Sequence, residues 1–393
     1  MRGFLKQKPT ILEVILTGLC LVLTASIAVG ADHEQLPSID WKHLYKEEAY
    51  SFNHKVVFLH EGNETIYLAG TYVASGKMES RGEIEGIWIW EIDSEGEKLS
   101  SFLIKNSEEA QTNFQNIVAL SVSKSKDISI VVQSREKETS LLRMDQKGNR
   151  VWTKKLGRGK HVSKIFSLGD GAVLLIGHEL LNPMILEIDN SGSVLRSKVF
   201  DRGRSDFFVD GLPGKSGGFV FLENSGELTQ FYMGPSNVWI SVYDSKMEKL
   251  AEQQFAGRNG NIIANDGHGY IVVYDRSHTA KQEIHLKSFG ESLEEKWNIK
   301  VVETPFGLGK FRVVRLLNGR ALVGGAINGH RWIGEVSANG KSLKKFNGQE
   351  GTVELGIDLK VFGKNLYIIS TVVHLTDQHA VNNQIKIVKL KTP

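Results

Sequence analysis

One short hairpin pattern recurs along nearly the whole chain and limits what it can fold into. Its clearest copy, TSLLRMDQKGNRVWTKKL at residues 139–156, has two apolar-alternating runs on either side of a polar turn. Asp145 opens the turn and can accept hydrogen bonds from backbone amides ahead of it, and Gly148 can adopt positive φ. The stretch is therefore predicted to be an antiparallel hairpin.

The same frame returns with a drifting period. The turn-opening position is occupied in the other copies by Asp93, Asp189, Asp244, Gly290, Ser337 and Lys389. Successive copies lie 52, 44, 55, 46, 47 and 52 residues apart. A spacing near this length is typical of four-stranded blades arranged radially.

A second hairpin pattern precedes each copy, which gives seven pairs of hairpins. We therefore predict an all-β fold, a seven-bladed β-propeller of four-stranded antiparallel blades with less than a tenth helix. The last copy, at residues 384–390, lacks a following strand, and residues 40–44 (DWKHL) resemble the missing one. An N-terminal strand is thus expected to complete the last blade and close the ring, which removes two exposed sheet edges.

The first 31 residues have the pattern of a secretory signal peptide. Arg2, Lys6 and Lys8 precede an apolar run over residues 14–29, which ends in small residues up to Ala31. This pattern predicts cleavage after Ala31, and the alternative is an uncleaved anchor. Residues 32–393 are then a single propeller domain without a cysteine. We expect a periplasmic or secreted protein with no stable membrane insertion after cleavage.

The overall charge excludes some classes of partner. The formal net charge is +3, and the first 31 residues contribute +2 of it, so the remainder is close to neutral. A strong basic field is absent, which argues against nucleic acid as a partner. We expect a monomer without a cofactor or a bound metal, and with a protein or an anionic ligand as its partner.

The longest connections lie on one face of the predicted ring. In a propeller, the loops between second and third strands share a face with the loops between blades, and the tight hairpin turns occupy the other face. The between-blade loops also combine glycine with basic residues that would surround the mouth of a central channel. The candidate ligand-binding residues are Arg158, Lys160, Arg202, Arg204, Arg258, Lys310 and Arg312.

Convergent guanidinium and ammonium groups suit a carboxylate, a phosphate or a sulfated glycan. The alternative is a set of solvated loop charges, which Asp201, Asp206 and Glu303 could neutralise. A weaker group of candidates on the same face could act as acid, base or metal ligand. Its members are His178, Asp275, His278, His330 and His374. Their spacing matches no metal motif, which favours the alternative that they are ordinary polar loop residues.

Four tryptophans lie in predicted third strands, at Trp88, Trp90, Trp239 and Trp332. A row of indoles could stack on sugars. In a propeller, however, these positions face the neighbouring blade, which favours core packing.

The frame LRMDQKGNRVW at residues 142–152 resembles the repeat of bacterial PQQ-like propellers, a group related in architecture to WD-type repeats. That group includes quinoprotein dehydrogenases and a propeller lipoprotein of outer-membrane protein assembly. The tryptophan of the repeat is present at Trp152 and Trp297 but is replaced by Ser100, Arg196, Ala251 and Lys344. The resemblance implies the architecture. Chains of this fold perform many unrelated functions.

The first functional hypothesis is an exported, non-enzymatic binding or scaffolding propeller that contacts a protein or an anionic ligand through its long-loop face. The second is a hydrolase or lyase that acts on a polyanionic glycan at the channel mouth. The third is a non-catalytic subunit of a periplasmic redox complex. The enzyme hypothesis requires a candidate histidine to approach a carboxylate and an arginine.

Overall fold

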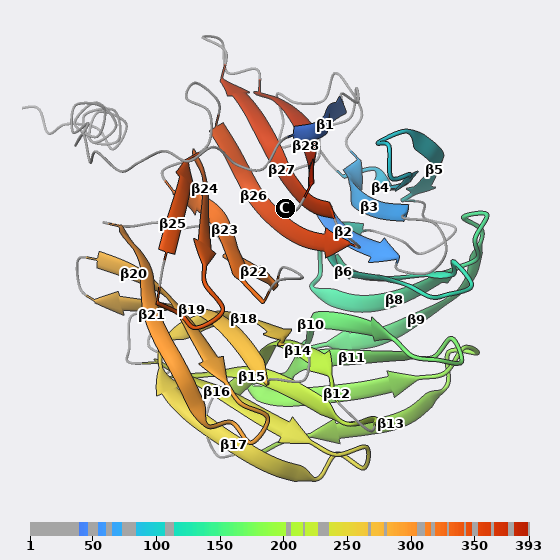
Figure 1. Ribbon diagram of the computed structural model, residues 1–393. Coiled ribbons are helices and arrows are strands. Elements are labelled where there is room, and N and C mark those ends of the chain that lie inside the picture. Colours follow the sequence, from blue (N-terminus) through green and yellow to red (C-terminus); the bar gives the residue numbers. More distant parts are fainter. Residues whose placement is uncertain are drawn as a thin grey trace, which may run out of the picture. The chain divides into compact units, whose positions relative to one another are not determined.

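Seven antiparallel sheets of four strands each make up the described part of the chain (Figure 1). The computed structural model describes residues 39–45, 54–59, 65–72, 84–106, 114–201, 206–214, 217–226, 236–265, 269–278, 281–304, 311–315, 319–327, 330–341, 343–347, 353–362, 365–375 and 381–391. The chain divides into two compact units, Met1–Glu34 and Gln35–Pro393. All described residues belong to the second unit, so the predicted signal peptide lies outside them.

Each sheet is one blade, and its strands follow one another in chain order. Blade 1 contains β2 (His54–Leu59), β3 (Thr65–Tyr72), β4 (Gly86–Ile92) and β5 (Lys98–Lys105). Blade 2 contains β6 (Phe114–Val122), β7 (Ile128–Ser134), β8 (Glu138–Met144) and β9 (Arg150–Arg158). Blade 3 contains β10 (Lys160–Ser167), β11 (Val173–Glu179), β12 (Asn182–Ile188) and β13 (Val194–Val199). Blade 4 contains β14 (Asp206–Pro213), β15 (Phe219–Gly226), β16 (Ser236–Tyr243) and β17 (Lys249–Ala256).

The remaining three blades complete the ring. Blade 5 contains β18 (Arg258–Ala264), β19 (Tyr270–His278), β20 (Lys281–Phe289) and β21 (Glu295–Thr304). Blade 6 contains β22 (Arg312–Arg315), β23 (Ala321–Ile327), β24 (His330–Val336) and β25 (Leu343–Asn347). Blade 7 contains β26 (Val353–Phe362), β27 (Asn365–Leu375), β28 (Val381–Lys391) and, from the other end of the chain, β1 (Ile39–Tyr45).

The first strands of the blades form the inner wall of the ring. Each first strand contacts the first strands of both neighbouring blades, and β26 contacts β2, so the circuit is closed. Strand β1 pairs antiparallel with β28, with Trp41 opposite Lys389 and Tyr45 opposite Ile385. The fold is thus the predicted seven-bladed β-propeller, and the described residues contain no α-helix. No helix of this part of the chain has the length and hydropathy needed to cross a membrane.

The turns between third and fourth strands have the chemistry predicted from the repeat. In blades 1 to 4 the carboxylate of the turn-opening aspartate accepts two backbone amides, two and four residues ahead. For Asp145 these amides belong to Lys147 and Asn149, at 2.9 and 2.8 Å. The fourth turn residue has positive φ, 82° at Gly148, which relieves the strain that a side chain would experience there. The sequence thus encodes these turns locally.

The turns of blades 3, 4 and 6 also receive hydrogen bonds from the outer strand of the preceding blade. The Trp152 indole donates to the Asn190 carbonyl at 2.8 Å, and Trp297 donates to Ala338 at 3.2 Å. At the equivalent position in blade 3, Arg196 donates to the Ser245 carbonyl at 2.8 Å. In these three copies the side chain at this position reaches the next blade, and arginine takes the place of tryptophan in blade 3.

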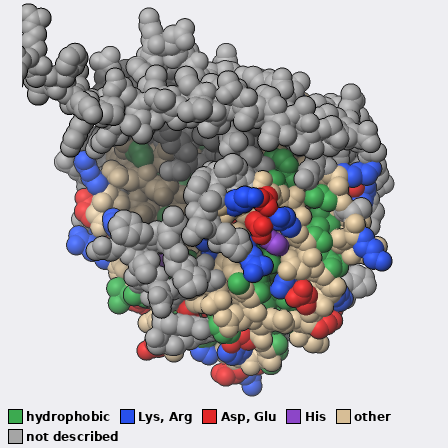
Figure 2. Space-filling view, turned by 90° about the vertical axis from the view of Figure 1, so that its left-hand side faces the viewer, with side chains coloured by type: hydrophobic (Ala, Val, Ile, Leu, Met, Phe, Trp, Pro, Cys, Tyr) green, Lys and Arg blue, Asp and Glu red, His purple; other side chains and the backbone are tan. Residues whose placement is uncertain are grey.

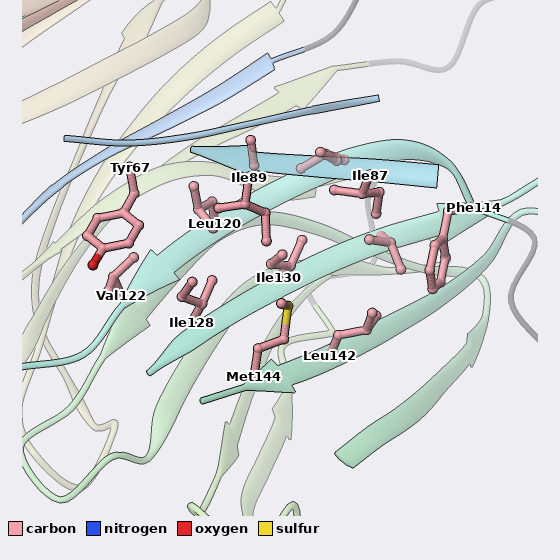
Figure 3. Close-up of a cluster of buried hydrophobic side chains, with 13 residues drawn as sticks. Tyr67, Ile87, Ile89, Phe114, Leu120, Val122, Ile128, Ile130, Leu142 and Met144 are labelled. Carbon is pink, nitrogen blue, oxygen red and sulfur yellow. The ribbon is translucent and has the colours of Figure 1, made fainter. Parts of the chain in front are cut away.

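The hydrophobic core is divided among the interfaces between blades. The described residues form seven apolar clusters, one for each pair of adjacent blades. Figure 3 shows the cluster between blades 1 and 2, in which Ile87 and Ile89 of β4 lie against Phe114 of β6, Ile130 of β7 and Leu142 of β8. The cluster that contains Ile66 and Tyr367 joins blades 1 and 7. Apolar packing between blades, together with the hydrogen bonds between them, therefore holds this cysteine-free ring together.

The tryptophans of the third strands serve this packing. Trp88, Trp90 and Trp332 are buried, at 6, 2 and 5% exposure, and Trp88 stacks on Trp90 with their centroids 4.2 Å apart. Trp239 is half-buried and donates its Nε1 hydrogen to Ser225. The prediction of core packing is confirmed for the three buried indoles.

Candidate functional site

A polar side chain occupies the same register position in five of the inner strands. The five are Lys164, Asp210, Asn261, Arg312 and Asp358, spaced 46, 51, 51 and 46 residues apart. Their ladder partners on the second strands are Ile176, Leu222, Val273, Gly324 and Ile369. In β10, β14, β18 and β26 an irregularity in strand pairing directly precedes the position. Such bulges change the direction in which a side chain points.

These side chains converge on the axis of the ring. Lys360, two residues beyond Asp358 on β26, interacts electrostatically with Lys164, Asp210, Arg312 and Asp358. Those four residues belong to blades 3, 4, 6 and 7, and groups from such different blades approach one another only at the axis. We call Lys164, Asp210, Asn261, Arg312, Asp358 and Lys360 the axial cluster.

Asp210 is the most highly bonded member of the axial cluster. Its carboxylate accepts from the Lys164 ammonium at 2.5 Å, the Ile262 amide at 2.9 Å, its neighbour Gly211 at 2.8 Å and the Asn261 side-chain amide. Burial by itself would raise the pKa of Asp210, but the Lys164 charge and these donors outweigh it, so the pKa lies below its ordinary value. Asp210 is therefore a buried, permanently charged carboxylate at neutral pH.

The polar contacts pass from one blade to the next. Lys164 of blade 3 also donates to the Gly211 carbonyl of blade 4 at 2.8 Å. Asn261 of blade 5 accepts from the Val313 amide of blade 6 at 3.0 Å. The guanidinium of Arg312 lies 3.7 Å from the Asp358 carboxylate of blade 7. The axial cluster therefore links five consecutive blades around the inner wall.

Solvent reaches the cations of this cluster more readily than the carboxylates. The side chains of Lys164 and Arg312 retain 37 and 35% exposure, against 6 and 22% for Asp210 and Asp358. Lys360 is exposed as well. Three cations thus oppose two carboxylates that lie deeper in the wall. Among the described side chains, the groups of the axial cluster that face solvent most are therefore positively charged.

Lys360 carries the excess positive charge. It touches solvent along the axis but is surrounded by protein, and this loss of hydration lowers the pKa of its ammonium. Lys164 and Arg312 lower the pKa further, and Asp358 and Asp210 oppose them. Within the described part of the chain, Lys360 makes no ion pair shorter than 4 Å. An anion placed beside Lys360 would replace the hydration that its ammonium has lost and would offset the positive charges of Lys164 and Arg312.

The basic residues predicted from the between-blade loops have several different environments. Arg312 belongs to the axial cluster. Lys160 is paired with Glu179 at 2.6 Å, and Arg258 with Asp275 at 2.8 Å, each within its own blade. Arg158 is exposed at the end of β9. Arg202, Arg204 and Lys310 lie outside the described residues.

The weaker candidates do not form a catalytic arrangement where their side chains are described. The His178 ring stacks on His161, centroid to centroid 4.7 Å, and its Nδ1 is buried without a described hydrogen-bond partner. Burial and the nearby His161 lower the pKa of His178 to about 4. It is thus neutral at pH 7 and contacts Phe207 on its other side.

Asp275 is a buried carboxylate held by donors from its own blade. Arg258, Asn259 and Gln282 all donate to it, yet burial raises its pKa. His278, His330 and His374 lie on β19, β24 and β27, and their side chains are outside the described set. In the part of the chain that the structure covers, no group of three or more His, Cys, Asp or Glu side chains could hold a metal ion.

One polar network on the flank of blade 5 was not anticipated. His285 contacts Glu283 at 2.9 Å, and Lys300 bridges Glu283 and Glu303 at 3.3 and 2.7 Å. Figure 2 shows basic, acidic and histidine side chains gathered on this flank of the molecule. Lys281 pairs with Glu303 and is the fifth residue of this network. The positive and negative charges balance, which suits an outer-strand stabilising network better than an anion site.

The axial residues other than Arg312 were missed from the sequence, although a signal exists. A charged or amide residue recurs at the start of four predicted first hairpins, or directly before it, at the period of the repeat. The four residues are Lys164, Asp210, Asn261 and Asp358. Alignment of the seven hairpins by register would have shown the recurrence. Lys360 has no such repeat and required the structure.

Searches by sequence return no relative: no family model matches the chain, and no curated protein matches it. Solved structures share its fold. A catalytically inactive virginiamycin B lyase from Staphylococcus aureus, solved with quinupristin, matches with a TM-score of 0.52 and 11% identity over 89% of this chain and 100% of its own. A structure of Drosophila Plexin A in complex with Semaphorin 1b matches with a TM-score of 0.51 and 8% identity, with 88% of each chain covered.

A WD40 domain from Toxoplasma gondii coronin is also similar, with a TM-score of 0.50 and 8% identity over 92% of this chain and 89% of that one. At such identities the likeness concerns the fold alone. The chain is a seven-bladed β-propeller with a positively charged axial cluster, and the similar structures include a lyase and a WD40 domain.

Proposed function

We propose that this protein is an exported, non-enzymatic binding propeller of the PQQ-like repeat type, which takes an anionic group at its axis and contacts a partner through its long-loop face. The observation that carries the proposal is the imbalance of the axial cluster. Lys164, Arg312 and Lys360 reach solvent, while Asp210 and Asp358 are retracted into the wall. A carboxylate or phosphate would receive charge-assisted hydrogen bonds there.

The fold does not by itself choose between binding and catalysis, because one similar structure is a lyase and another contains a protein complex. The side chains favour binding. A hydrolase or lyase needs an acid or base near the anion site, and His178, the candidate histidine with a described side chain, stacks on His161 and Phe207 instead. The deeper carboxylate, Asp210, is bonded by Lys164 and backbone amides, which suits a structural role.

The proposal is tested by calorimetric titration of the protein with inorganic phosphate, acetate and a sulfated oligosaccharide. We expect at least one to bind, with affinity that falls about tenfold in Lys360→Met because one charge-assisted contact is lost. The matched control is Lys246→Met, which removes the same charge from an exposed turn between β16 and β17. Equal affinities of Lys360→Met and the unaltered protein, or no binding of any probe, would refute the proposal.

A further inference from the structure

The turn between β11 and β12 of blade 3 exposes two adjacent leucines. Glu179 pairs with Asn182 across the ladder, so Leu180 and Leu181 form a two-residue loop. Their exposures are 71 and 46%. The loop lies at the same end of the strands as the connections between blades. The most exposed large apolar side chain in the described residues is therefore on the long-loop face.

The backbone of this turn does not favour leucine. Leu180 has φ of +56°, a left-handed conformation that is rare for a bulky side chain and that glycine or asparagine adopts readily. The corresponding loop of blade 6, between Ile327 and His330, has the sequence Asn328-Gly329, the preferred composition for such a turn. Leu180 thus combines backbone strain with exposure to water. Strain of this kind is concentrated at functional sites.

The backbone of the two leucines is hydrogen-bonded to the neighbouring segments. The Leu180 amide donates to the Gly159 carbonyl at 2.8 Å, and the Asp206 amide donates to the Leu181 carbonyl at 2.9 Å. Gly159 belongs to the connection between blades 2 and 3, and Asp206 opens blade 4. The backbone that carries the apolar pair is therefore hydrogen-bonded on both sides. An apolar anchor on a backbone that is already ordered loses less conformational entropy on binding.

The surroundings of the leucines are basic. Residues 135–138, 155–160 and 179 contain five Lys or Arg residues and three Glu residues, and the fully buried Asp206 adds a fourth acidic residue, which leaves a net charge of +1. These segments border the Leu180–Leu181 turn. Glu138 pairs with Arg158 in the ladder, and the Thr139 hydroxyl donates to the Lys160 carbonyl at 2.6 Å. Gly159, which lies between Arg158 and Lys160, accepts the Leu180 amide. Arg158 is exposed beside Gly159. A partner that covers the leucines would meet a net positive rim, which an acidic partner complements.

We propose that the Leu180–Leu181 turn and its basic rim form a docking surface for a protein segment that carries apolar side chains together with Asp or Glu. This inference rests on the proposed function, since it assigns a partner to the long-loop face. The leucines enter the apolar part of the segment, and the acidic side chains of the segment pair with Arg158 and its basic neighbours. The axial anion site is not needed for this contact.

The test is selection of a random peptide library displayed on phage against the full protein, followed by affinity measurement of the enriched peptides. We expect enriched peptides to combine apolar residues with Asp or Glu. They should bind the double variant Leu180→Asn/Leu181→Ser at least about 30-fold more weakly, as for a two-residue hot spot. Because asparagine tolerates the left-handed conformation, Leu180→Asn alone should have a thermal midpoint equal to or above that of the unaltered protein.

Leu250→Ser is the matched control, because Leu250 is equally exposed, at 66%, but lies on the outer strand β17. Peptides should bind this variant as they bind the unaltered protein. The inference is overturned if selection yields no Leu180-dependent peptide, or if the peptides bind the double variant as tightly as the unaltered protein. Anion titrations of the same double variant separate the two proposals. The axial site is intact in this variant, so its anion affinity should be unchanged, whether or not the peptides still bind.

Discussion

The indole Nε1 of Trp152 donates to the Asn190 carbonyl at 2.8 Å, and this bond ties the outer strand of blade 2 to a turn of blade 3. The indole ring lies against Gly192 of the same turn, where a Cβ would come within 3.3 Å of the ring. Packing and hydrogen bonding therefore act together at one point of the interface between the two blades.

Replacement of Trp152 by phenylalanine separates these two contributions. Phenylalanine retains packing on Gly192 but loses the hydrogen bond, which should lower the free energy of unfolding by about 1 kcal/mol. Trp152→Ala also removes the packing and should cost about 2 to 3 kcal/mol. Urea denaturation measures both, with Trp297→Phe as the equivalent change in blade 5. If Trp152→Phe and Trp152→Ala were equally destabilising, the packing contribution would be disproved.

Removal of the closing strand should weaken the whole ring. Strand β1 pairs with β28, and the Tyr45 hydroxyl donates to the Gly96 carbonyl of blade 1 at 2.6 Å. Deletion of residues 32–50 exposes the edge of β28 and breaks this link, so the thermal midpoint should fall by on the order of 10 °C. Tyr45→Phe, which loses only the hydroxyl, should lower it by no more than a few degrees. An unchanged midpoint in the deletion variant would refute ring closure by β1.

Asp210 should make the protein sensitive to acid. Its pKa is lower in the folded state, so its stabilising contribution is complete above the unfolded value of about 4 and is lost as pH falls through the folded pKa. Asp210→Asn should lose about 2 kcal/mol at pH 7, a figure reduced because Lys164 is partly exposed. Denaturation at several pH values should show a shallower acid slope for the variant. If the free energy of unfolding fell equally with pH in the variant and in the unaltered protein, Asp210 would not be the cause of the acid sensitivity.

His178 predicts a second pH dependence at milder acidity. Its folded pKa, about 4, lies below the unfolded value of about 6.5, so the unfolded chain takes up a proton in this window and the folded chain does not. Stability should therefore decline by about 2 to 3 kcal/mol between pH 6.5 and 4. His178→Phe retains stacking on His161 and Phe207 and does not titrate. The stability of this variant should decline less than that of the unaltered protein over this range. An identical decline would show that His178 is not the group responsible.

The sequence predicted the features that local chemistry determines. Asp145 and Gly148 specify their turn without help from the rest of the chain, and the repetition of that turn gave the number of blades. The role of Arg196 was not predictable, because the repeat places it at the position of Trp152 but does not show that its side chain reaches the next turn. The direction of Lys164 and Asp210 depends on strand bulges, and Leu180 appeared ordinary until its φ and exposure were known.

The axis of the ring is proposed to bind an anion beside Lys360. Crystals of the unaltered protein and of Lys360→Met, grown with selenate, would test it through the anomalous signal of selenium, with selenate standing in for sulfate or phosphate. We expect an axial peak within hydrogen-bond distance of Lys360 or Arg312 in the unaltered protein, and its loss in the variant. Selenate bound only on the outer surface, with no axial peak at saturating concentration, would show that the axis is not an anion site.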